Sequence, residues 1–115
     1  MSRKGGGLRP WWLQRITAVA LVPLSLWFVF SLLGLPSLGQ STVVNWIAVT
    51  WNAVPLGLFV AAVAWHSKLG VEVVIEDYIH GSAKHAVLLC STIAHVIVGA
   101  AGLFAIVKII ARTSG

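Results

Sequence analysis

The chain has 115 residues, of which 58% are hydrophobic and 10% are charged, with a mean hydropathy of +0.93 and a formal net charge of +5. Soluble domains carry about 25% charged residues, so this composition excludes a water-soluble globular enzyme. It also excludes a disordered chain, which needs low hydrophobicity and high charge. The composition predicts a single all-α integral membrane domain over residues 1–115, with basic residues that mark membrane orientation rather than nucleic-acid binding.

The first membrane span is predicted at 14–35, because a bilayer core needs roughly 20 consecutive apolar residues. Trp11 and Trp12 precede it, where an interfacial aromatic belt belongs. Pro23 falls inside the span, and lipid-embedded helices tolerate proline. The turn-rich segment 34–39 ends the span.

The second apolar region, 43–65, has two interpretations. Hydropathy alone makes all of it the span and leaves His66 at an interface. Alternatively, Pro55 marks a helix boundary, because the residue before a proline avoids the helical region and proline suits a first helical turn. We favour this second interpretation, with an interfacial segment at 42–53 and a span at 55–78 that is roughly 35 Å long.

The third span is predicted at 86–108. Three spans place the termini on opposite sides of the membrane, and basic residues concentrate on the inner side. This favours an N-terminus in the cytoplasm or mitochondrial matrix and a C-terminus on the outer side. The inner residues are Arg3, Lys4, Arg9, Arg15, Lys68 and Lys84, and the outer ones are Lys108 and Arg112.

His66 is the leading candidate for chemistry, because ionisable side chains inside a membrane are expensive and often functional. At membrane depth its imidazole can ligate haem iron through one nitrogen while an acceptor orients the other. Gly70, one turn later, would let a flat macrocycle or another helix approach closely. The alternative is an interfacial histidine bonded to a carbonyl or to water. On the favoured interpretation, Lys68 and Glu72 must snorkel or find polar partners.

Asp77 and Tyr78 follow His66 by eleven and twelve residues, so Asp77 falls nearly on the His66 face, about 16 Å nearer the inner surface. A tyrosine hydroxyl beside a carboxylate could hydrogen-bond a quinone carbonyl, although interfacial tyrosines are also common anchors. Arg15 could pair with a haem propionate or with quinone-site groups, or act only as a topogenic charge. His95, in the third span, could be a second haem ligand, a proton relay or a helix-packing hydrogen bonder.

No Cys-x-x-Cys pair, Gly-x-Gly-x-x-Gly motif or Walker loop occurs in the sequence. The sequence therefore contains no motif for a zinc, iron–sulfur, flavin, nicotinamide or ATP site.

Taken together, the run from Trp11 to Ala18, the three-span length and His66-x3-Gly70 followed by Asp77-Tyr78 resemble the hydrophobic membrane-anchor D subunit of succinate dehydrogenase, respiratory complex II. The form is most similar to the alphaproteobacterial or mitochondrial type. The resemblance covers essentially the whole chain, and its specific part is the spacing from the histidine to the Asp-Tyr pair. The Ser-x-x-His-Arg and His-Gly-x-Arg-His segments of the partner C subunit are absent.

The resemblance implies that this chain is half of a six-helix anchor bundle formed with the C subunit. It implies that His66 is one axial ligand of a b-type haem, with the second ligand from C, and that Tyr78 hydrogen-bonds ubiquinone with Asp77 beside it. Arg15 would lie near the haem propionates or the quinone pocket.

The implied activity belongs to the assembled complex, in which a flavoprotein oxidises succinate, an iron–sulfur subunit carries electrons, and ubiquinone is reduced at the anchor. The chain alone would have no catalytic activity and would lie in a bacterial or mitochondrial inner membrane. One alternative is the anchor of a fumarate reductase or a menaquinone-linked relative. Another is a small transporter or assembly factor in which His66 and His95 act together.

Overall fold

The computed structural model describes residues 8–114, with side chains described from 11 to 112. Three of its helices are long and apolar enough to cross a membrane, judged by length and composition. The prediction of an all-α protein with three such helices is confirmed. The helices are α1 (Leu8–Leu33), α2 (Gln40–Ala48), α3 (Thr50–Tyr78) and α4 (Ser82–Ser114).

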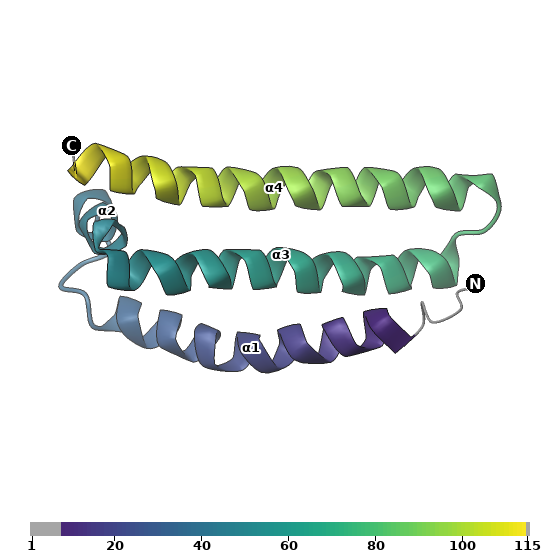
Figure 1. Ribbon diagram of the computed structural model, residues 1–115, viewed down its shortest axis with the longest axis horizontal. Helices are drawn as coiled ribbons and strands as arrows, with labels where there is room; N and C mark the ends of the chain where they lie inside the picture. The colour runs from purple at the N-terminus through teal and green to yellow at the C-terminus, as the bar shows by residue number, and fades with distance from the viewer. Residues whose placement is uncertain (1–7, 115) are drawn as a thin grey trace.

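The three long helices lie side by side in one layer with α3 in the middle (Figure 1). The short helix α2 lies at the end of the layer where α3 begins and α4 finishes. Within the described residues, the backbones of α1 and α4 do not come together. The start of α1 and the end of α4 lie at opposite ends of the layer, as an odd number of crossings requires.

The break before the middle helix lies at Val49, so the predicted helix boundary at Pro55 is wrong by five residues. Val49 is extended, and the Asn52 side chain donates a 2.9 Å hydrogen bond to the carbonyl of Trp46, the residue that also accepts from the Val49 N–H. This bond satisfies a carbonyl at the end of α2 and lets α3 start at Thr50. Pro55 lies inside α3, beyond its first turn.

The layer buries little apolar surface by itself. The large exposed apolar side chains lie on every long helix, and among them are Trp51 at 88% and Leu33 at 74% exposure. Surface of this kind needs lipid or another protein against it. The buried residues of the described chain are apolar side chains and one glycine: Ala53, Leu56, Leu69, Ile75, Gly99 and Ile106.

An aromatic cluster holds α2 against the layer. The Trp46 ring stacks on Trp27 of α1, with centroids 5.5 Å apart and an interplanar angle of 29°. Phe28 lies beside Trp46 and is 5.1 Å, centroid to centroid, from Phe59 of α3. These contacts join α1, α2 and α3 at the end of the layer remote from Tyr78.

Two of the basic residues behind the orientation prediction, Arg3 and Lys4, lie outside the described residues, as does the side chain of Arg9. Of the others, Arg15 and Lys84 lie in the half of the layer that contains Tyr78, and Arg112 lies near the opposite end.

Glycine lets α3 and α4 approach closely. A Cβ atom at Gly99 would lie 3.2 Å from the Cβ of Ala64, and one at Gly102 would lie 3.1 Å from Cγ1 of Val60. At Gly57 the corresponding contact, to Leu103, is an ordinary 3.6 Å. The spacing of these two helices therefore depends on Gly99 and Gly102 more than on Gly57.

We expect Gly99→Ala to leave the assembled protein less stable than Gly57→Ala. Both changes gain about 0.5–1 kcal/mol of helix stability, but only Gly99→Ala forces a clash with a Cβ that cannot rotate away, at a cost of about 1–3 kcal/mol. Thermal unfolding in detergent would measure the difference. Equal stability of the two variants would contradict the tight contact at Gly99.

Candidate functional site

His66 lies near the middle of the central helix, roughly 24 Å along the axis from Thr50 and 18 Å from Tyr78 at ~1.5 Å per residue. The ring is half-buried, and its Nδ1 is 3.0 Å from the Oγ1 atom of Thr17 in α1. That oxygen is also 2.8 Å from the carbonyl oxygen of Leu13. His66 is therefore held against α1 by a side-chain hydrogen bond at a depth suited to a membrane-buried group.

A groove of about 360 Å3 opens beside the His66 ring, lined by Ser67, Gly70, Val71 and Val74. A Cβ at Gly70 would meet only the Gln14 side chain, at 3.9 Å. The helix surface thus stays low one turn after His66, which suits the close approach of a flat group.

The Gln14 side chain of α1 lies next to Gly70, one of the residues that line this groove. Its Oε1 atom is buried and has no hydrogen-bond partner among the described residues. Buried polar atoms in native proteins are nearly always paired, and the two ends of an amide exchange by a flip. The amide end nearest Gly70 is the nitrogen, Nε2.

Tyr78 and Asp77 stand at the end of α3, away from His66. Tyr78 is 79% exposed and Asp77 is also exposed, so both are free to meet a partner or a ligand. Positions 67, 71, 74 and 78 share one face of a helix. The face that forms the groove beside His66 therefore continues to Tyr78.

Arg15 does not lie beside His66. Arg15 precedes Thr17 by two residues and therefore lies about 200° around α1 from it. Its guanidinium stacks over Trp11, 5.5 Å from the ring centroid. The side chain is exposed. The structure thus brings His66 together with Thr17 and leaves Arg15 facing away from α3.

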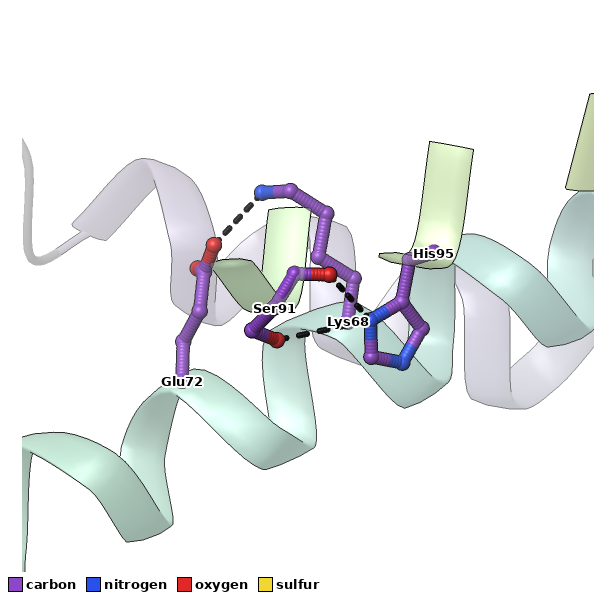
Figure 2. A network of polar contacts seen from close by, with 4 residues as sticks. All are labelled: Lys68, Glu72, Ser91 and His95. Carbon is purple, nitrogen blue, oxygen red and sulfur yellow. Dashed lines mark hydrogen bonds and ion pairs between the residues drawn. The ribbon is translucent and has the colours of Figure 1, made fainter. Parts of the chain in front are cut away.

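Lys68 and Glu72 find polar partners in each other. Figure 2 shows the Lys68 Nζ reaching the Glu72 carboxylate, at 2.6 Å, with 16% and 24% of the two side chains exposed. The Lys68 ammonium also lies 5.1 Å from the Trp65 ring centroid. The charges that seemed costly at this depth are paired one turn apart, on a side of α3 about 200° from His66.

His95 makes a contact within its own helix. Its Nδ1 lies 2.8 Å from the Ser91 carbonyl oxygen and 3.4 Å from the Ser91 hydroxyl (Figure 2). It lines a second groove, of about 460 Å3, between α3 and α4. His66 and His95 thus have separate partners and line separate grooves, which does not favour a shared role.

The side chains around His66 suit a metal that is already held in a cofactor better than they suit a bare metal ion. The described residues contain no cluster of three or more His, Cys, Asp or Glu side chains able to hold a bare metal ion. Haem iron already has four porphyrin nitrogens and needs only axial ligands from protein. One imidazole at membrane depth, beside a glycine, fits that requirement.

Thr17 is the site residue that the sequence motifs did not single out. Its pairing with His66 depends on the antiparallel packing of α1 against α3. The sequence signal is only a hydroxyl in an apolar span one turn after Leu13, which is too common to identify a partner.

The chain is similar to known proteins over most of its length. The family model for succinate dehydrogenase/fumarate reductase transmembrane subunits matches residues 3–107. The chain is 33% identical over 105 residues to the succinate dehydrogenase hydrophobic membrane anchor subunit of Rickettsia bellii, which covers 91% of this chain and 77% of the relative. It is also 33% identical over 88 residues to the succinate dehydrogenase membrane anchor subunit of Reclinomonas americana, covering 74% and 73%.

Proposed function

This chain belongs to the family of succinate dehydrogenase/fumarate reductase transmembrane subunits, and from that membership we propose that it is the hydrophobic membrane anchor of a succinate dehydrogenase. The observation that carries the proposal is the match to named anchor subunits over up to 91% of the chain. It docks the flavoprotein and iron–sulfur subunits to the membrane. The named relatives favour succinate dehydrogenase over a fumarate reductase anchor or a menaquinone-linked relative, which would share this fold.

The open layer supports a second hydrophobic subunit as partner. Three helices in one layer leave broad faces on which large apolar side chains are exposed. A cytochrome b-type C subunit with three helices of its own would cover one face and complete a six-helix bundle. Lipid would cover the other face.

His66 is the axial ligand that this chain contributes to a b-type haem shared with that subunit. The half-buried ring, the groove beside it and the low surface at Gly70 support this assignment. When bound, the haem supplies a reversible one-electron carrier at the centre of the membrane. Arg15 faces away from His66. It pairs with a haem propionate or with quinone-site groups only where another subunit brings them beside the exposed face of α1.

Tyr78 and Asp77 belong to the ubiquinone site. Tyr78 donates a hydrogen bond to a quinone carbonyl, and the Asp77 carboxylate beside it relays protons from the inner surface to the quinone. The exposure of both side chains supports this role, because a quinone pocket built with other subunits needs them free. The end of the layer with Tyr78 then faces the cytoplasm or matrix, together with the N-terminus, in a bacterial or mitochondrial inner membrane.

Purification under mild detergent tests the proposal. We expect a tagged form of this chain to co-purify with a flavoprotein, an iron–sulfur protein and a second hydrophobic subunit, and to show a low-spin haem spectrum. The same preparation should oxidise succinate. Recovery of the chain as a stable single-subunit membrane protein, from cells that express the other subunits, would contradict it.

A further inference from the structure

The Thr17 hydroxyl lies between the His66 ring and the backbone of its own helix. Its oxygen is 3.0 Å from the Nδ1 of His66, 2.8 Å from the carbonyl oxygen of Leu13 and 3.1 Å from that of Gln14. Three polar neighbours therefore compete for one hydroxyl hydrogen, which the oxygen can donate only once while it also accepts.

The donors and acceptors around Thr17 favour one tautomer of the His66 ring. The shortest contact is to the Leu13 carbonyl, one turn back, a common acceptor for a threonine in a helix. If the hydroxyl donates there, it can only accept from His66. The Nδ1 atom must then carry the hydrogen, and Nε2 must carry the lone pair.

The opposite assignment leaves a donor unsatisfied. If Thr17 donated to Nδ1, the hydrogen of the neutral ring would sit on Nε2. Within the described residues, His66 has no hydrogen-bond partner besides Thr17, and an unpaired N–H away from water is unfavourable. The first assignment satisfies both hydrogens and leaves only a lone pair open.

We propose that Thr17 is the positioning residue that holds His66 in the Nδ1–H tautomer and so presents the Nε2 lone pair to the haem iron. This inference rests on the proposed function. A hydrogen bond from the remote ring nitrogen fixes the orientation of a metal-bound histidine and raises its basicity. Greater electron donation favours ferric iron, so the Thr17 contact lowers the haem midpoint potential.

The test compares Thr17→Val, which keeps the shape and loses the hydroxyl, with Thr17→Ser, which keeps the hydroxyl and loses a methyl group. Ser25→Ala is the matched control, because it removes a hydroxyl from α1 about 12 Å farther along the helix. Each variant is purified as the assembled complex. Haem content per flavin is measured during dilution, and the haem midpoint potential is measured by redox titration.

We expect Thr17→Val to weaken haem retention by about tenfold and to raise the midpoint potential. Thr17→Ser and Ser25→Ala should match the unaltered complex. A Thr17→Val complex with unchanged retention and potential would overturn the inference. So would a Thr17→Ser complex as impaired as Thr17→Val, because the effect would then come from packing.

Thr17→Ala provides the same loss of hydroxyl if the valine variant does not assemble. Failure of both to assemble, while Thr17→Ser does, would make Thr17 a structural residue and overturn the inference. The proposed function fails by a different result. In that case the haem is absent from the unaltered complex, or it survives replacement of His66.

Discussion

Replacing His66 with alanine is expected to remove the low-spin bis-histidine haem spectrum from the assembled complex. The ring lies near the middle of α3 beside an open groove, and on the proposed ligation its loss would leave the haem iron without the ligand from this chain. Removing a hydrogen bond to a metal-bound side chain changes metal affinity by about 10–100-fold. Loss of the ligand itself should therefore reduce haem content by about tenfold or more. Optical spectra of the purified complex, with haem measured per flavin, provide the test.

His95→Ala is the matched control for this experiment. His95 is likewise a half-buried histidine in a membrane-spanning helix, but it bonds to Ser91 of its own helix and lines a different groove. Its replacement should leave the haem spectrum unchanged. A spectrum that survives His66→Ala and disappears with His95→Ala would assign the ligand to α4 and remove His66 from the site.

Composition and the lengths of the apolar runs were sufficient to predict the fold class. The apolar runs are long and interrupted by few charges, and the bilayer permits few structures besides helices. The start of α3 could not be predicted in the same way, because Pro55 is the stronger local signal. The break at Val49 depends on a hydrogen bond from Asn52 to Trp46, which a sequence pattern does not reveal.

The candidate site was predictable only in part, for the same reason. His66 stands out because an ionisable side chain in an apolar helix is unusual. The partner of His66 is Thr17, 49 residues away in sequence, and only the register of α1 against α3 brings them together. Lys68 and Glu72 could have been paired from their spacing, since residues four apart meet on a helix surface.

Replacement of Tyr78 is the second change with a large expected effect, because its proposed role depends on the hydrogen of the phenolic hydroxyl. We expect Tyr78→Phe to slow ubiquinone reduction by about tenfold to a hundredfold, since a positioned proton donor contributes at least that much to many reactions. Succinate oxidation with an artificial dye should remain intact, because the dye accepts electrons without the quinone site. The haem spectrum should also persist, as Tyr78 is roughly 18 Å along α3 from His66.

Glu76→Gln is the control for Tyr78→Phe. Glu76 is exposed at the same end of α3 but lies about 200° around the helix from Tyr78, so its replacement should leave quinone reduction unchanged. The ratio of quinone to dye activity distinguishes the possible causes of a loss. A fall in both activities for Tyr78→Phe would indicate defective assembly, and an unchanged ratio would show that the Tyr78 hydroxyl does not act on the quinone.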